Sequence, residues 1–161
     1  MPTGLLPTPP SDGSVSTDPQ ATAEAFLHAL ARSDLATAMG YLAEDVEYVN
    51  VGLPAIHGRS RVTKALSGLV RPQVGFEVYL HAISADGPIV LTERTDVITV
   101  GPLRIQFWVW GRFDVDEGSI TLWRDSFDFL DMTKAMVRGL AGIVVPSLRP
   151  SPPEGQEPPG R

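Results

Sequence analysis

The fold is decided by residues 89–113, which read IVLTERTDVITVGPLRIQFWVWGRF. Polar and apolar residues alternate on both sides of the dipeptide Gly101-Pro102, and this period of two predicts β-strands from Ile89 to Val100 and from Leu103 to Phe113. Glycine can adopt a positive φ and proline fixes its own φ, so the dipeptide suits a tight turn. The stretch is therefore expected to form an antiparallel hairpin.

The same alternation continues on both sides of this hairpin. It predicts further strands from Phe76 to Ile83 and from Ser119 to Phe127. Residues 84–88 (SADGP) and 116–118 (DEG) supply the intervening turns. Because such short loops join antiparallel neighbours, the four strands are expected to form a meander.

Helical patterns precede the meander. Asp18-Pro19 is a favourable start, because aspartate caps a helix and proline suits its first position, and Ser33-Asp34 repeats the capping signal. Residues 46–51 alternate instead and are expected to be extended. Three helices are expected, with apolar stripes at Ala23, Phe26, Leu27 and Leu30; at Leu35, Ala38, Met39 and Leu42; and, between Arg59 and Leu69, at Val62, Ala65, Leu66 and Leu69.

A last helix is expected from about Asp131 to Leu140, against the edge or mouth of the sheet. Helices followed by a meander predict an α+β fold, in which helices cover one face of a curved antiparallel sheet and leave a cone-like pocket. The folded domain is expected at residues 18–145, between proline-rich, flexible or polyproline-like tails at residues 1–17 and 146–161. The apolar positions of the last helix are Met132, Met136, Val137 and Leu140.

Charge and hydropathy exclude several classes of partner. The chain has 13 Lys and Arg against 19 Asp and Glu, a net charge of -6, and shows no basic cluster of the kind that binds nucleic acid. No apolar run approaches the roughly 20 residues that a membrane span needs. The N-terminus also lacks the pattern of a secretory signal, so a cytoplasmic protein without membrane insertion is expected.

Cysteine and histidine give no sign of a metal centre. The sequence has no cysteine, which excludes disulfides, thiolate metal sites and cysteine nucleophiles. His28, His57 and His81 lack the spacing of metal ligands. They are interpreted as structural or solvated residues, with His28 on the exposed side of its helix. Neither a metal nor another cofactor is expected.

Three segments carry candidate catalytic groups. Arg94 and Asp96 are two residues apart in a predicted strand, so their side chains leave the same face. The opposite face is about as apolar, so alternation alone does not decide which face is buried. Tyr48 and Asn50 share a strand face in the same way, as do Asp125 and Phe127. Asp128 is interpreted as a polar residue that marks the end of the strand.

Together, Tyr48-Val49-Asn50, Glu93-Arg94-Thr95-Asp96 and Trp123-Arg124-Asp125-Ser126-Phe127-Asp128 resemble the limonene-1,2-epoxide hydrolase family. The resemblance covers roughly residues 20 to 140, with the motifs in matching order. It implies a cone-shaped α+β fold with a curved, mixed sheet, similar to that of nuclear transport factor 2 and ketosteroid isomerase. It also implies a homodimer that pairs through an exposed sheet face.

The resemblance assigns a role to each polar group. It implies that Asp96 is the general acid, Asp125 the general base and Arg94 the bridge between them, while Tyr48 and Asn50 hold the attacking water. Two ionised aspartates beside one arginine would leave a buried site at -1, so the pair is expected to take up one proton. The predicted activity is the hydrolysis of an epoxide without a covalent intermediate.

The expected substrate is a bulky apolar epoxide, either terpenoid, sterol-like or fatty-acyl, whose hydrolysis would serve detoxification. Its pocket is expected at Ile98, Phe107, Val109 and Phe127, which share faces with the aspartates or match the pocket strand of the family. Two alternatives remain open. One is an isomerase or dehydratase on the same cone that uses a lone aspartate, and the other is a small-molecule-binding module without catalysis.

Overall fold

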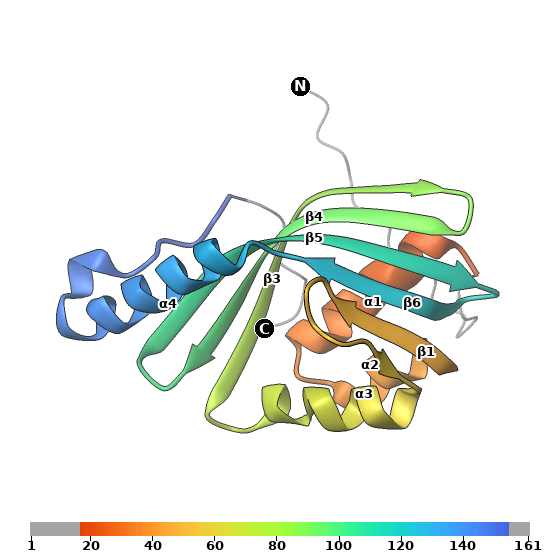
Figure 1. The fold of residues 1–161 in the computed structure, drawn as a ribbon, viewed down its shortest axis with the longest axis horizontal. Coiled ribbons are helices and arrows are strands. Elements are labelled where there is room, and N and C mark those ends of the chain that lie inside the picture. Colours follow the sequence, from red (N-terminus) through yellow and green to blue (C-terminus); the bar gives the residue numbers. More distant parts are fainter. Residues whose placement is uncertain (1–16, 155–161) are drawn as a thin grey trace.

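A computed structural model describes residues 17–154, and in this part of the chain six strands form one mixed sheet (Figure 1). Their spatial order is β2-β1-β6-β5-β4-β3. Tails were predicted at residues 1–17 and 146–161, and of these, residues 1–16 and 155–161 lie outside the described residues. The strands are β1 (Leu42–Asn50), β2 (Ile56–His57), β3 (Val74–Asp86), β4 (Ile89–Val100), β5 (Leu103–Asp116) and β6 (Ser119–Ser126).

The predicted meander is confirmed, because β3, β4, β5 and β6 pair in succession and antiparallel. Residues 89–100 form β4 as predicted, and Val100 pairs with Leu103 across the turn, where Gly101 has a φ of 56°. The strands β3 and β5 are longer than predicted. Phe127 lies just beyond β6, because the chain turns there into the last helix.

The sheet is mixed because β1 runs parallel to β6, with Tyr48 opposite Trp123 and Asn50 opposite Asp125. The prediction that Leu42 belongs to the second helix is wrong, since β1 begins at that residue. Helix α2 (Leu35–Gly40) ends before Tyr41, and the carbonyl of Tyr41 already accepts a hydrogen bond from the Ile120 amide of β6 at 2.7 Å. Leu42 thus pairs with Ile120 of β6 and does not continue the apolar stripe of the second helix.

The helices α1, α2 and α3 begin near the predicted positions. The Asp18 carboxylate accepts a hydrogen bond from the Ala21 amide at 2.8 Å, and Asp34 caps the second helix in the same way. The third predicted helix continues as the 3-10 helix η1 after Leu66, close to Gly68. The helical elements are α1 (Pro19–Ala31), α2 (Leu35–Gly40), α3 (Arg59–Leu66), η1 (Ser67–Val70), α4 (Phe129–Val144) and η2 (Pro146–Leu148).

Helix α1 covers one face of the sheet and supplies the centre of the core (Figure 1). Phe26 is fully buried, and its ring meets those of Phe113 and Trp123 edge to face, at centroid distances of 6.0 and 4.9 Å. Helices on one face of a curved sheet are the predicted α+β architecture, which is thereby confirmed.

Helix α4 packs on β5 differently from the prediction. Val137 and Leu140, two positions of its predicted apolar stripe, are 61% and 52% exposed. The buried contact is made by Gly139, where a Cβ would collide with the backbone of Arg104, so glycine permits the close approach of the helix to β5. The chain then folds back, and Arg149 Nε donates to the Gly142 carbonyl at 3.1 Å.

Within residues 17–154, no helix combines the length and the apolar character that crossing a membrane requires.

Replacing Phe26 by alanine is expected to lower the free energy of unfolding by about 3–5 kcal/mol, because the ring is fully buried between α1 and the sheet. Urea denaturation followed by circular dichroism measures this loss. Leu130→Ala is the control, since Leu130 is 62% exposed and its truncation should change stability by about 0.5 kcal/mol or less. Equal losses in the two variants would contradict this description of the core.

Candidate active site

The structure decides which face of β4 is buried, a question that the alternation leaves open. Arg94 and Asp96 lie on the face that α1 covers, and they are only 1% and 5% exposed. Asp125 of β6 is equally buried at 5%. Three charged side chains thus share the interior of the protein, where an unpaired charge would cost several kcal/mol.

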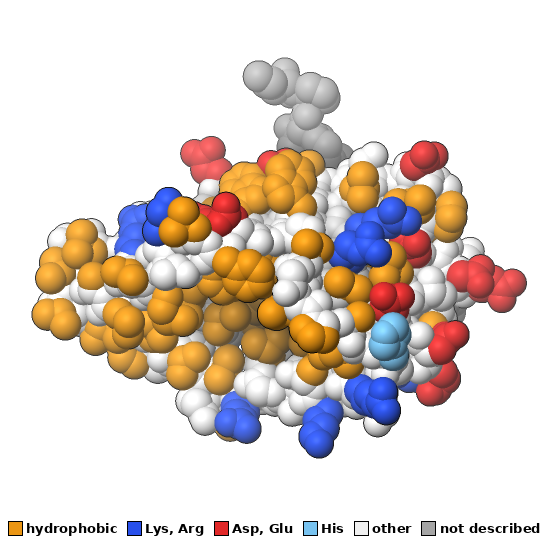
Figure 2. Space-filling model, in the orientation of Figure 1, with side chains coloured by type: hydrophobic (Ala, Val, Ile, Leu, Met, Phe, Trp, Pro, Cys, Tyr) orange, Lys and Arg blue, Asp and Glu red, His pale blue; other side chains and the backbone are white. Residues whose placement is uncertain are grey.

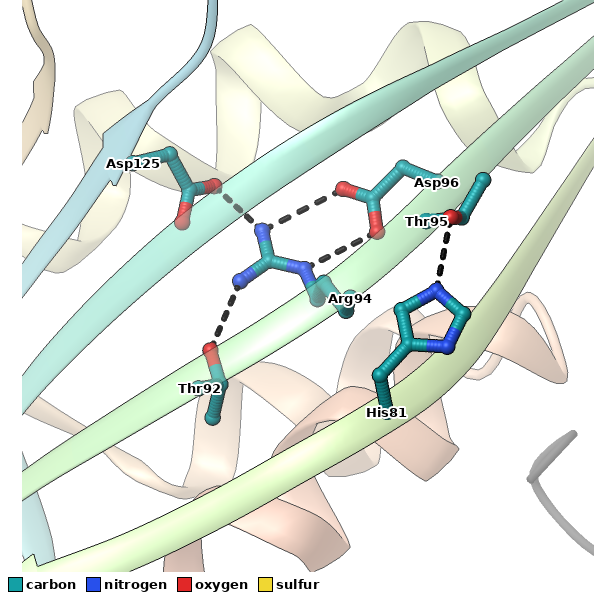
Figure 3. A network of polar contacts seen from close by, with 6 residues as sticks. All are labelled: His81, Thr92, Arg94, Thr95, Asp96 and Asp125. Carbon is teal, nitrogen blue, oxygen red and sulfur yellow. Dashed lines mark hydrogen bonds and ion pairs between the residues drawn. The ribbon is translucent and has the colours of Figure 1, made fainter. Parts of the chain in front are cut away.

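The Arg94 guanidinium lies between the two carboxyl groups (Figure 3). Its Nε donates to Asp96 Oδ1 at 2.9 Å and its Nη2 to Asp96 Oδ2 at 3.2 Å. The same Nη2 lies 2.8 Å from Asp125 Oδ2, and Nη1 donates to Thr92 Oγ1 at 3.3 Å. Every guanidinium nitrogen therefore has a partner, and the planar group is held in one orientation.

Asp125 keeps one oxygen unused by this network. Its Oδ1 is buried and has no hydrogen-bond partner among the described residues. The neighbouring strand brings Asn50 beside it, because Asn50 pairs with Asp125 in the parallel register and Tyr48 lies two residues earlier on the same face. All five predicted catalytic residues are thus brought to one region of the covered sheet face.

Burial raises the pKa of Asp96. Desolvation raises the pKa of this carboxyl to about 6, against the opposing influence of the Arg94 guanidinium, and the nearby Asp125 raises the pKa further. Arg94 stays charged, because Asp125 and Asp96 outweigh the effect of its burial and hold its pKa above the ordinary value. The Asp96 carboxyl therefore holds its proton below about pH 6 and loses it above that pH.

Tyr48 remains a hydrogen-bond donor. Burial raises the pKa of its hydroxyl well above the ordinary value, and the charge of Asp125 adds to this effect, while a hydrogen bond with Asn50 opposes it. The Tyr48 ring is stacked on that of Trp123 with a centroid distance of 4.0 Å. This contact fixes the orientation of the phenol relative to β6.

The four residues expected to bind substrate also lie together. Phe107 and Val109 are buried on β5, Ile98 and Phe127 pack against them, and the Phe107 and Phe127 rings meet at 5.8 Å. Met132 of α4 completes the cluster. Figure 2 shows a recess lined with hydrophobic side chains at the centre of this view, beside α4.

The histidines lie apart from the Arg94 cluster. His57 is exposed, and His81 shares a 2.8 Å hydrogen bond with Thr95 (Figure 3). The His81 ring also stacks on that of Trp108. The prediction that His28 is exposed is wrong: it is half-buried, and burial lowers its pKa. Among residues 17–154, no three His, Cys, Asp or Glu side chains are grouped as a metal site would require.

Two residues next to Arg94, Thr92 and Gly111, are not among the site residues predicted from the sequence. Thr92 is a partner of the guanidinium and shares the strand parity of Arg94 and Asp96, a signal present in the sequence. Gly111 lies opposite both Thr92 and Asp125 in the sheet. A glycine inside a strand is a recognised sign of a close approach, and here Arg94 approaches it.

Comparison with known proteins places this geometry in a family. Residues 17–138 match the family model described as the limonene-1,2-epoxide hydrolase catalytic domain. The chain is 54% identical over 126 residues to epoxide hydrolase EphG of Mycobacterium tuberculosis (strain ATCC 25618 / H37Rv), a match that covers 78% of this chain and 84% of that protein.

Comparison with solved structures supports the same family assignment. An M. tuberculosis LEH-like epoxide hydrolase is similar with a TM-score of 0.78 and 50% identity, over 83% of this chain and 95% of that one. An NTF2-like protein from Burkholderia pseudomallei K96243 shares the fold alone, with a TM-score of 0.63 and 18% identity over 73% and 96% of the two chains. The chain therefore belongs to the limonene-1,2-epoxide hydrolase family, as its motifs predicted, and is an enzyme of the epoxide hydrolase class.

Proposed function

We propose that this enzyme adds water to an apolar epoxide in one step and releases a vicinal diol. The observation that carries the proposal is the buried Arg94 bridge between Asp96 and Asp125, with one Asp125 oxygen left without a partner beside Tyr48 and Asn50. Epoxide opening by water needs one acid and one base, and this cluster supplies both from its own side chains.

The acid is Asp96. With Arg94 positive, one proton on the two carboxyl groups makes the cluster neutral, and the raised pKa of Asp96 favours that carboxyl as its holder. The protonated carboxyl donates to the ring oxygen as the carbon–oxygen bond breaks, so that the leaving alkoxide is neutralised as it forms. General acid assistance of this kind contributes about 10²- to 10⁴-fold to a rate.

The base is Asp125, acting through its unpartnered Oδ1. A water molecule donates to this oxygen and to the Asn50 side-chain carbonyl and accepts from the Tyr48 hydroxyl, which directs a lone pair at the epoxide carbon. As the new carbon–oxygen bond forms, the water proton passes to Asp125. The proton is then on Asp125 instead of Asp96, and proton exchange restores the starting state.

The substrate is a bulky apolar epoxide, terpenoid, sterol-like or fatty-acyl. Support comes from the apolar lining next to the charged cluster, above all Phe107, Val109 and Phe127. An apolar lining binds the hydrocarbon part of such a substrate and excludes bulk water, which leaves the held water as the nucleophile. Removal of a reactive epoxide would serve detoxification, and we infer that the enzyme works in the cytoplasm.

We also propose that the enzyme is a homodimer that pairs through the outer face of its sheet. Trp108, Trp110 and Leu91 point away from the catalytic face and are 42%, 58% and 55% exposed. Beside them lies a hollow of about 350 Å³, lined in part by Arg112 and Arg124. Large exposed apolar side chains on one sheet face are typical of a surface between subunits.

Asp96→Asn and Asp125→Asn are each expected to lower the rate of diol formation about 10²- to 10⁴-fold or more, because each removes one of the two proton-transferring groups. A panel of terpenoid, sterol-like and fatty-acyl epoxides, followed by mass spectrometry of the diols, measures the rates. The matched control is Asp114→Asn. Asp114 pairs with Arg112 at the same two-residue spacing and 2.8 Å from its Nε, but half-exposed and on the outer face.

The control variant should hydrolyse the epoxide as the wild type does. A wild-type rate of hydrolysis in Asp96→Asn would contradict the role of Asp96 as the acid, and the same rate in Asp125→Asn would contradict the role of Asp125 as the base. If the wild-type enzyme converts no epoxide of the panel, the proposed substrate class is wrong.

A single turnover in ¹⁸O-water is expected to place the label in the diol and none in the protein, because water itself attacks the ring. A covalent ester would instead leave ¹⁸O in the carboxyl group of Asp96 or Asp125 after its hydrolysis. Mass spectrometry of the product and of the peptides that contain these two residues separates the two routes. Label in either peptide would contradict the one-step mechanism.

The value of kcat/KM is expected to fall as the pH rises above about 6. The pKa of Asp96 is raised, so its acidic form predominates below that pH and is lost above it, and the general acid is lost with it. A pH series of initial rates locates this alkaline limb. Tyr48→Phe should lower the rate without moving the limb, since the Tyr48 hydroxyl stays protonated there; a limb that vanishes in this variant would contradict the assignment.

A further inference from the structure

One row of the sheet crosses four strands beneath the charged cluster. Asn50 of β1 pairs with Asp125 of β6, Asp125 with Gly111 of β5, and Gly111 with Thr92 of β4. Paired residues point to the same face, so this row forms one floor of the site. Gly111 is its only member without a side chain.

The Arg94 guanidinium fills the space above Gly111. Arg94 starts from the next row of β4, opposite Val109, and has to cross β5 to reach Asp125 on β6. A Cβ at position 111 would collide with Arg94 Nη1 and with Thr92 Oγ1, and would lie 3.3 Å from Asp125 Oδ1. Any other residue at this position would therefore occupy the path of the arginine.

Thr92 restrains the same guanidinium from the opposite side to the carboxyl groups. Its hydroxyl oxygen accepts from Nη1 at 3.3 Å, the one nitrogen that neither aspartate engages. Without this contact, Nη1 would have no hydrogen-bond partner among the described residues. Figure 3 shows the resulting arrangement, with Thr92 on one side of the guanidinium and Asp96 and Asp125 on the other.

We propose that Gly111 and Thr92 are positioning residues, which together hold Arg94 where it bridges Asp96 and Asp125. The inference rests on the proposed function for its catalytic consequence, but the geometry of the arginine stands on its own. Neither residue touches the reacting atoms. Their effect passes through the guanidinium to the proton that the two aspartates share.

Displacement of the guanidinium changes the proton affinity of the pair. The charged and titratable groups that act on Asp96 and Arg94 are each other and Asp125, and Tyr48 of β1 faces all three. Arg94 supplies the positive charge among them, and a nearby positive charge lowers the pKa of a carboxyl group. When it moves away, the pair holds its protons more tightly, and the pH profile of the enzyme moves to higher pH.

The test is Gly111→Ala. The nearest atoms to the added methyl group are the ends of side chains, and the backbone φ of Gly111 lies outside the left-handed region, so the strand accepts alanine while Arg94 has to move. We expect kcat to fall about 10²-fold, as a displacement of the order of 1 Å can cause. We also expect the pH profile to shift upward by about one unit or more.

Gly40→Ala and Gly68→Ala are the matched controls, because a Cβ at either position meets no atom within 4 Å. Both should keep the wild-type rate and pH profile. Thr92→Val keeps the shape of the side chain but removes the hydroxyl that accepts from Arg94, so it should shift the pH profile in the same direction as Gly111→Ala. Thr92→Ser keeps the hydroxyl and should have the wild-type pH profile. Thermal unfolding of each variant verifies that the fold is retained.

The second readout needs no substrate. Titration of the Asp96 and Asp125 carboxyl groups by ¹³C NMR should give higher midpoints in Gly111→Ala than in the wild type. Unchanged midpoints, or a pH profile that stays in place while the rate falls, would overturn the inference. If the wild-type enzyme hydrolyses no epoxide, the proposed function fails, and the NMR midpoints still decide whether Gly111 positions Arg94.

Discussion

The guanidinium of Arg94 is the constraint on which the rest of the structure depends. It is almost fully buried, and a buried charge of this kind persists only when its partners are buried with it. Asp96 and Asp125 supply them from different strands, so β4, β5 and β6 have to align for the arginine to be neutralised. Neutrality further requires one proton on two carboxyl groups. The interaction that neutralises the buried arginine is thus the one that, in the proposed mechanism, supplies the proton for the reaction.

Much of the fold is predictable from local patterns. The strand at residues 89–100 and the three hairpins follow from a period of two and from turn residues, which are short-range signals. Leu42 marks the limit of such signals, because it fits both the stripe of α2 and the start of β1, and only pairing with Ile120 decides. Helix α4 marks another, since its closest contact with β5 uses Gly139, whereas Val137 and Leu140 of its predicted apolar stripe remain exposed.

Strand parity predicted the pairing of Arg94 with Asp96 but not its importance. The sequence contains the same spacing again at Arg112 and Asp114, and the two pairs have nearly identical geometry. The two pairs differ in the face of the sheet on which they lie. Arg94 and Asp96 lie on the face that α1 covers, whereas Arg112 and Asp114 lie on the outer face. Which face is buried depends on tertiary packing. Gly111 has the same dependence: its missing side chain has a meaning only when Arg94 crosses above it.

The parallel contact of β1 with β6 joins segments that are distant in the chain, whereas the meander closes through short turns. Loop closure costs more entropy as the loop lengthens, and contacts between distant segments slow folding. The hairpins of β4, β5 and β6 can therefore form before β1 docks on the sheet edge. Along such a route the charged groups of Arg94, Asp96 and Asp125 meet first, and Tyr48 and Asn50 join them last. A folding chain would then bring together the residues proposed as acid and base before it gains the residues proposed to hold the water.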